Sequence, residues 1–195
     1  MRVERDAIPQ WNSDGVIPPV NVHDPISHDR SPYSVSFTDI ILRFGITPRR
    51  QAILKGLLEF RSALYTVGLI RGFQWIDGSF LEDIERREER DPEDIDLVTF
   101  FHLPDGVTEE EIIRSAPGLF NHESLKSNYH VDAYFVRLNA GAPEILVDSA
   151  AYWYSLWSHR RDGQWKGFLQ IDLSNNDDTV AQRNLDELMG GGDSV

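Results

Sequence analysis

The chain has 195 residues and a formal net charge of -13, and 41% of its residues are hydrophobic and 11% aromatic. This length suits one domain with a buried core, and the composition excludes a disordered chain. Proteins that grip a long polynucleotide usually carry a basic face, so the charge argues against long DNA and favours small nucleotides or a protein as the partner.

The absence of cysteine excludes a disulfide framework and a thiolate metal site. Residues 1–6 lack the apolar stretch that is typical of a signal peptide. No apolar run approaches the length of about 18 residues that a membrane span needs. We therefore expect a cytoplasmic protein with no membrane partner.

Residues 1–36 contain five of the ten prolines, together with Gly15 and several Asp, Asn and Ser residues. This composition predicts an extended arm with turns. His23 and His28 are predicted to be loop residues, not ligands. The arm should pack on the body of the domain through its apolar residues, which are Ile8, Trp11, Val16, Ile17 and Val20.

Thr47-Pro48 predicts a helix start, because Thr is a good N-cap and Pro suits the first helical position. Apolar residues follow at helical spacing and predict a helix over 48–67, ending near Gly68 or Gly72. The arginines in this segment are predicted on its solvated face; they are Arg49, Arg50 and Arg61.

Phe73-Gln74-Trp75-Ile76 is predicted to form the first central strand, and Gly78-Ser79 follows it after one residue. Gly78 has no Cβ and allows a ligand to approach the backbone closely, with an ordinary turn glycine as the alternative. A charged segment over 80–93 comes next, and its middle, 85–90, indicates an additional helical turn.

Asp94-Ile95-Asp96 leads into a strand predicted at about 95–101. Successive side chains of a strand alternate between faces, so Asp94 and Asp96 point the same way. Neighbouring carboxylates repel each other, and Mg²⁺ relieves this because it binds one or two carboxylates together with phosphate oxygens. The alternative is a solvated acidic loop that caps an ordinary strand.

Thr108 and Glu111 form a capping-box pattern that predicts a helix over 109–116. The segment 130–136 alternates in polarity and predicts a third strand. On this strand His130, Asp132 and Tyr134 share one face.

The segment 144–157, which we expect to enter a helix, carries an aromatic cluster that belongs either to the core or to a base-stacking platform. Asp162-Gly163 between two extended arms predicts a hairpin. It gathers Arg160, Arg161 and Lys166, which either contact triphosphate or acceptor or form a solvated tip. We expect the carboxylates of Asp94, Asp96 and Asp132 to converge on one open cleft beside Gly78 and Ser79. At least one of the three basic residues, Lys166 first, should face this cleft and should behave as an ordinary surface side chain on substitution. Residues 174–195 are polar and predict a tail.

The segments Ile76-Asp77-Gly78-Ser79 and Asp94-Ile95-Asp96-Leu97 resemble the signature of the nucleotidyltransferase (DNA polymerase β-like) superfamily. In that pattern Gly and Ser or Gly follow an apolar residue, and an Asp-apolar-Asp/Glu-apolar run follows a spacer. The spacer is a little longer here. The Pro-rich arm, the aromatic segment and residues 160–167 look like a small uncharacterised bacterial branch of the superfamily.

The resemblance implies an α/β (α+β) nucleotidyltransferase fold: a small mixed sheet with flanking helices and a C-terminal β-hairpin, in a single domain over 1–195. It also implies transfer of a nucleoside monophosphate from a nucleoside triphosphate to an acceptor hydroxyl, with Mg²⁺ or Mn²⁺. Asp94 and Asp96 would hold the metal. Asp132 would complete a second metal site and help to deprotonate the acceptor, with Asp148 as a less favoured alternative.

The same resemblance implies that Gly78 and Ser79 open a helix and position the phosphates of the nucleotide. Lys166 and Arg161 are further candidates for nucleotide binding. The acceptor would be a protein or an RNA. One alternative is a toxin–antitoxin role, as in minimal nucleotidyltransferases that act as antitoxins by modifying a partner toxin. Another is a non-catalytic nucleotide-binding or interaction module.

Overall fold

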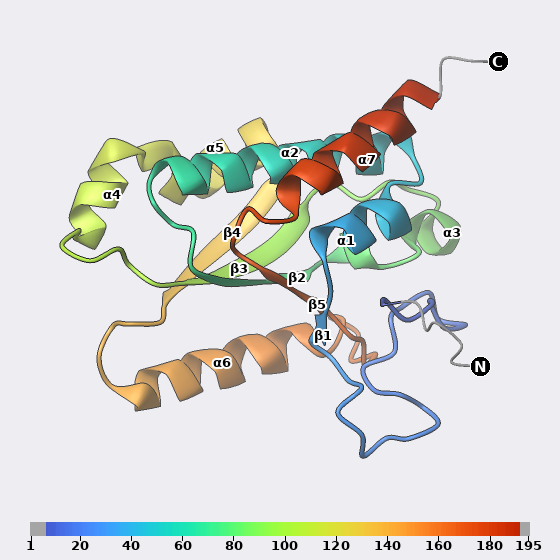
Figure 1. The fold of residues 1–195 in the computed structure, drawn as a ribbon. Helices are drawn as coiled ribbons and strands as arrows, with labels where there is room; N and C mark the ends of the chain where they lie inside the picture. Colours follow the sequence, from blue (N-terminus) through green and yellow to red (C-terminus); the bar gives the residue numbers. More distant parts are fainter. Residues whose placement is uncertain (1–6, 192–195) are drawn as a thin grey trace.

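The computed structural model describes residues 7–191, and its centre is a five-stranded mixed sheet (Figure 1). The strand order is β1-β5-β2-β3-β4, in which β1 and β4 run parallel to their neighbours and β2 pairs antiparallel with both β5 and β3. The strands are β1 (Tyr33–Ser34), β2 (Gly72–Asp77), β3 (Ile95–Phe101), β4 (Val131–Arg137) and β5 (Leu169–Asp172).

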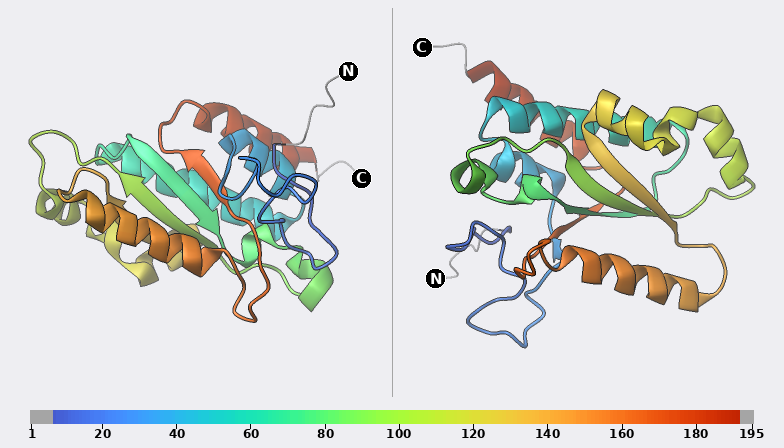
Figure 2. Two further views of the ribbon diagram at one scale, coloured as in Figure 1. Left: turned by 90° about the horizontal axis from the view of Figure 1, so that it is seen from below. Right: turned by 180° about the vertical axis from the view of Figure 1, so that it is seen from behind.

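Helices cover both faces of this sheet. Four helices, α1, α2, α5 and α7, lie over one face and α6 runs along the other, as two opposite views agree (Figures 1 and 2). The helices are α1 (Phe37–Phe44), α2 (Pro48–Thr66), α3 (Ile84–Glu88), α4 (Glu109–Ser115), α5 (His122–Tyr129), α6 (Pro143–Trp157) and α7 (Asp178–Gly190), with short 3₁₀ turns η1 (Ser79–Leu81) and η2 (Pro117–Phe120). The prediction of a mixed sheet with flanking helices is therefore confirmed.

Strand alternation decides which side chains meet which helices. On one face, Phe135 contacts Phe60 of α2, with ring centroids 6.4 Å apart. On the other, Tyr134 contacts Trp153 of α6 at 4.7 Å. Asp132 and Tyr134 share a face, so the acidic residues lie on the α6 side of the sheet, away from α2.

Local signals fix two helix starts as predicted. The Thr47 side chain accepts a hydrogen bond from the Arg50 amide at the start of α2, and Thr108 and Glu111 form both halves of the predicted capping box at α4. The N-terminal arm is ordered over the described residues, and Ile8, Val16 and Ile17 are buried in the core.

Three expectations about the fold are wrong. The predicted hairpin is reduced to one antiparallel bridge, His159–Trp165, because only β5 continues as a strand. Residues 178–190 of the predicted polar tail form α7, with Ala181 and Leu185 buried. The end of that tail, residues 192–195, lies outside the described residues.

The third wrong expectation concerns α2, whose Arg50 and Arg61 are buried instead of solvated. Arg61 donates to Asp178 of α7, to Gln74 of β2 and to the carbonyls of Asp172 and Ser174. Since each guanidinium nitrogen has a partner, burial of this charge is compensated.

Candidate functional site

Three aspartates form a row across three adjacent strands. Asp77 of β2 is directly opposite Asp96 of β3, and Asp96 is directly opposite Asp132 of β4. Directly paired residues present their side chains on the same face of a sheet, so the register brings the three carboxylates together. Asp94 precedes β3 by one residue and lines the same cleft.

This cleft, which we call the acidic cleft, has a volume of about 740 Å³. Among the described residues that line it, eight carboxylates face five basic side chains. The carboxylates are Asp77, Glu82, Glu88, Glu93, Asp94, Asp96, Asp132 and Asp162, and the basic residues are Arg90, Lys126, Arg160, Arg161 and Lys166. Its net charge is therefore negative, so an anionic ligand needs an added cation to enter favourably.

Gly78 is required where β2 meets the cleft. Its φ is +92° and its ψ is -178°, a conformation open essentially to glycine alone. A Cβ at this position would lie 2.3 Å from Asp96 Oδ2. Gly78 thus makes room for the Asp96 carboxylate, and Ser79, the next residue, lines the cleft. The turn opens only the three-residue η1 instead of the expected helix.

The environment of Asp96 makes its charged form costly. Burial, and after it the nearby carboxylates of Asp77, Asp94 and Asp132, raise the pKa of Asp96 to about 7 against a smaller opposing effect of Lys166. A bound cation would therefore stabilise the charged form of Asp96.

The helix α5 supplies a lysine and a histidine that contact the acidic cluster. Lys126 Nζ lies 2.8 Å from Asp132 Oδ2 and 3.1 Å from Asp94 Oδ2, and His122 Nδ1 lies 2.9 Å from Asp132 Oδ1. Burial alone would raise the pKa of Asp132, but the hydrogen bonds from Lys126 and His122 hold it below its usual value. The ammonium group bridges two of the carboxylates that the sequence assigned to a metal.

Lys166 is buried, with 5% of its surface exposed, so the expectation of an ordinary surface lysine is wrong. Its Nζ lies 2.8 Å from Asp77 Oδ1 and 3.4 Å from Glu82 Oε1. Burial would lower the pKa of Lys166, but Asp77 and Glu82 raise it above its usual value. Lys166 lines the cleft as expected, but its charge is already engaged by two buried carboxylates.

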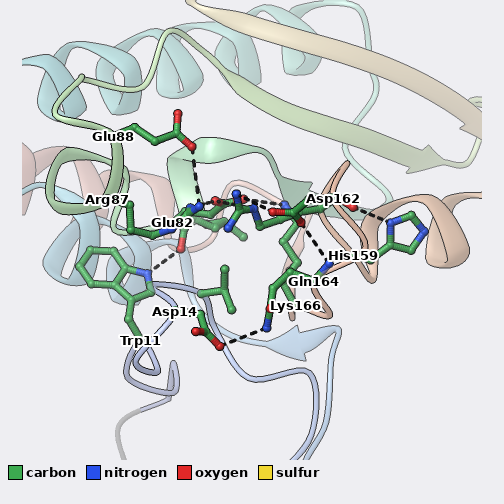
Figure 3. Close-up of polar contacts among 12 residues, drawn as sticks. Trp11, Asp14, Glu82, Arg87, Glu88, His159, Asp162, Gln164 and Lys166 are labelled. Carbon is green, nitrogen blue, oxygen red and sulfur yellow. Dashed lines mark hydrogen bonds and ion pairs between the residues drawn. The ribbon is translucent and has the colours of Figure 1, made fainter.

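Glu82 connects two segments that are distant in sequence, 82–87 and 160–166 (Figure 3). It pairs with Arg87 at 2.5 Å and with Lys166, and Arg160 lies 3.7 Å from it. The arm joins the same region, because Trp11 Nε1 donates to the Leu81 carbonyl at 2.6 Å. Of the predicted basic residues, Arg160 thus belongs to this network, and Arg161 is exposed at the cleft.

The start of α2 holds both ends of the charged segment 80–93. Arg50 donates to the carbonyls of Phe80 and Glu82 and pairs with Glu85 at 2.6 Å. Arg49 donates to the carbonyls of Pro92 and Glu93, immediately before Asp94. These contacts fix where the chain leaves Gly78 and where it re-enters at Asp94.

Sequence reasoning brought together Asp94, Asp96 and Asp132 and missed other residues of the cleft. Asp77 was detectable, because strand alternation places its side chain on the same face of β2 as Phe73 and Trp75. Lys126 carried no signal, since α5 is a polar helix with one buried residue, Leu125. One further expectation does not hold: His130 caps α5 with a φ of +55° and precedes β4, so it does not share a strand face with Asp132. Asp148, the less favoured alternative to Asp132, lies on α6 and does not line the cleft.

Within residues 7–191, no group of three or more His, Cys, Asp or Glu side chains is already arranged to hold a metal ion. The chemistry of Asp94, Asp96 and Asp132 nevertheless fits Mg²⁺, which takes carboxylate oxygens. Burial and the neighbouring carboxylates raise the pKa of Asp96, and a bound cation would offset both by stabilising the charged carboxylate. Lys126 would have to move away from Asp94 and Asp132 for those oxygens to be available.

The fold and the cleft define an α+β protein with an acidic site at one face of a mixed sheet. The chain belongs to a family of unknown function, DUF6932, whose model matches residues 9–172 and thus spans the sheet and the cleft. No curated protein and no solved structure matches the chain. None of the helices in residues 7–191 combines the length and apolar character needed to cross a membrane.

Proposed function

We propose that this protein is a metal-dependent nucleotidyltransferase that acts in the acidic cleft. The observation that carries the proposal is the convergence of Asp94, Asp96 and Asp132 on one cleft beside Gly78. The sequence resemblance of the Gly78-Ser79 and Asp94-Ile95-Asp96 segments to nucleotidyltransferases supports the same reaction.

In the proposed reaction the acceptor hydroxyl oxygen forms a bond to the α-phosphorus of a nucleoside triphosphate. The bond between that phosphorus and the oxygen that bridges the α- and β-phosphates breaks, and pyrophosphate leaves. The hydroxyl proton passes to a carboxylate of the cluster. Asp94, Asp96 and Asp132 would hold Mg²⁺ or Mn²⁺. When bound, the metal stabilises charge on the attacking and leaving oxygens.

The charge of the cleft supports a metal–nucleotide complex as its ligand. A bare triphosphate would be repelled by the excess of carboxylates, whereas its Mg²⁺ complex carries less negative charge. Arg161, exposed at the cleft, is the basic candidate for a phosphate contact. The net charge of -13 favours a protein acceptor, including a toxin partner, over a long polynucleotide.

The test is incubation of the protein with each α-labelled nucleoside triphosphate, with Mg²⁺ or Mn²⁺, and with protein and RNA from a cell lysate. We expect label to transfer to an acceptor in wild type and not in the Asp94→Asn/Asp96→Asn variant. Asp91→Asn/Asp105→Asn removes two carboxylates that do not line the cleft and should leave transfer intact. Equal labelling by all three proteins, or none by any, would reject the proposal.

A second candidate function is a non-catalytic nucleotide-binding module. The Lys126 bridge between Asp94 and Asp132 favours it, because an ion-paired cluster has fewer free metal ligands. This candidate predicts nucleotide binding that is insensitive to Mg²⁺ and no transfer of label. The Mg²⁺ dependence of binding therefore separates the two candidates.

A further inference from the structure

One wall of the acidic cleft is aromatic. Tyr134 of β4 and the α6 residues Tyr152 and Trp153 line it, and we call these three the aromatic wall. The Trp153 ring centroid lies 4.7 Å from that of Tyr134 and 5.1 Å from that of Tyr152. Tyr134 follows Asp132 by two residues on the same face of β4, so the wall continues directly from the acidic row.

The aromatic wall is not simply part of the hydrophobic core. Tyr152 is 60% exposed and Tyr134 is 37% exposed. By contrast Trp157, which lies one turn after Trp153 on α6, is 6% exposed and packs on Phe168. Trp153 is half-buried against the core. Rings that only filled the core would be covered as Trp157 is, so the exposure of the first two requires another explanation.

We infer that the aromatic wall binds the nucleobase of the nucleotide substrate; this rests on the proposed function. The cleft joins a strongly charged region to an uncharged aromatic one, which matches a ligand with an ionic end and a planar apolar end. Stacking on aromatic rings suits any base, because every base has a π face. The carboxylates would then recognise the metal–triphosphate end, and the wall would recognise the base.

The test compares Mg²⁺ complexes of ATP, GTP, CTP and UTP with the Mg²⁺ complex of inorganic tripolyphosphate, which has no base. Binding is measured by calorimetry. Wild type should bind at least one nucleotide about tenfold or more tightly than tripolyphosphate. Tyr152→Ala and Trp153→Leu should each weaken nucleotide binding by about fivefold or more, as expected for a lost stacking contact, and leave tripolyphosphate binding unchanged.

Trp165→Leu is the matched control, because Trp165 is 67% exposed and does not line the cleft. Its nucleotide affinity should equal that of wild type. Thermal unfolding of each variant identifies any loss of affinity caused by misfolding, and Tyr152→Ala, at an exposed position, serves if Trp153→Leu fails to fold.

The outcomes distinguish failure of the aromatic-wall inference from failure of the proposed function. Two results would overturn the inference that the aromatic wall binds the nucleobase. One is equal affinity for nucleotides and tripolyphosphate, and the other is a tighter binding of nucleotides that survives both wall substitutions. The Asp94→Asn/Asp96→Asn variant would still test the metal site. If adenosine or guanosine binds and is lost with Tyr152→Ala, but Mg²⁺-dependent triphosphate binding is absent, the wall holds and the proposed function fails. No binding of any of these ligands would overturn both.

Discussion

At the scale of single residues, Gly78 occupies a constrained position beside the cleft. It combines a glycine-only backbone conformation with a distance of 2.3 Å between an ideal Cβ and Asp96 Oδ2. Gly106 also has a positive φ, +77°, but an added Cβ there meets nothing within 4 Å. A comparison of substitutions at Gly78 and Gly106 therefore separates the cost of backbone strain from the cost of a clash with Asp96.

We expect Gly78→Ala to lower the free energy of unfolding by more than Gly106→Ala, whose cost should be the backbone strain of about 1–2 kcal/mol. Gly78→Ala should also displace Asp96 and remove Mg²⁺-dependent nucleotide binding, which Gly106→Ala should retain. Urea denaturation and calorimetric titration measure the two effects. Equal stabilities for the two variants would contradict the close packing of Gly78 against Asp96.

Asp96 provides a prediction about pH. Its pKa in the folded protein is about 7, above the ordinary value of 3.8, so the folded state binds this proton more tightly than the unfolded state. The resulting stabilisation is complete below about pH 4 and is lost as pH rises through about 7. Asparagine imitates the protonated side chain and does not titrate.

In metal-free buffer, Asp96→Asn should therefore gain stability relative to wild type as pH rises, by about 1 kcal/mol or more between pH 4 and pH 8. Urea denaturation at each pH measures this difference, and Asp105→Asn, at an exposed loop position, controls for the loss of one carboxylate. A stability difference between Asp96→Asn and wild type that is the same at pH 4 and pH 8 would show that burial and the neighbouring carboxylates do not raise the pKa of Asp96.

At the scale of elements, α2 supports the site from behind the sheet. Arg50 is fully buried and satisfies the carbonyls of Phe80 and Glu82 while pairing with Glu85. The turn after Gly78 and the short α3 thus depend on a side chain from an earlier helix.

Arg50→Met should lower the free energy of unfolding by about 3–5 kcal/mol, because it leaves buried carbonyls and a carboxylate without their partner. Arg86→Met is the control: Arg86 pairs with Asp83, but its side chain is 60% exposed, and such pairs contribute at most about 1 kcal/mol. Urea denaturation compares the two. A small effect at Arg50 would mean that the segment 80–93 is held by other contacts.

The elements that sequence reasoning placed correctly are those with strong local signals. Thr47-Pro48 marks the start of α2, the capping box marks α4, and the apolar run after Asp96 gives β3. The burial of Arg50 and Arg61 was not predictable in this way, because their partners lie far along the chain. An arginine in a helix looks the same in sequence whether it faces water or distant buried carbonyls.

The candidate site shows the same division. Alternation along β3 and β4 placed Asp96 and Asp132 on defined faces, and parallel pairing of the two strands then put them side by side. Lys126 and the burial of Lys166 depend on how α5 and the segment 158–167 pack on the sheet. Those positions follow from tertiary packing and not from any local pattern.

At the scale of the whole molecule, the two faces of the sheet have different roles. The face toward α2 is closed by apolar packing and by Arg61, whereas the face toward α6 holds the acidic cleft. The helix α7 packs against α1 and α2, on the closed side, and Asp178 at its start pairs with Arg61 at 2.8 Å. The C-terminal helix is thus an integral part of the domain that supports the cleft from the opposite side.

Leu185→Ala in α7 should therefore destabilise the entire domain. Leu185 is fully buried, and truncation of a buried leucine costs about 2–5 kcal/mol, whereas Leu188→Ala, at a 38% exposed position of the same helix, should cost less than about 1 kcal/mol. Circular dichroism follows the helices, and tryptophan fluorescence follows the five tryptophans, of which Trp153 and Trp157 line the cleft. We expect both signals to shift together to a lower melting temperature, as in a two-state transition. A fluorescence transition that stays at the wild-type temperature while the helical signal shifts would mean that α7 unfolds separately and does not support the cleft.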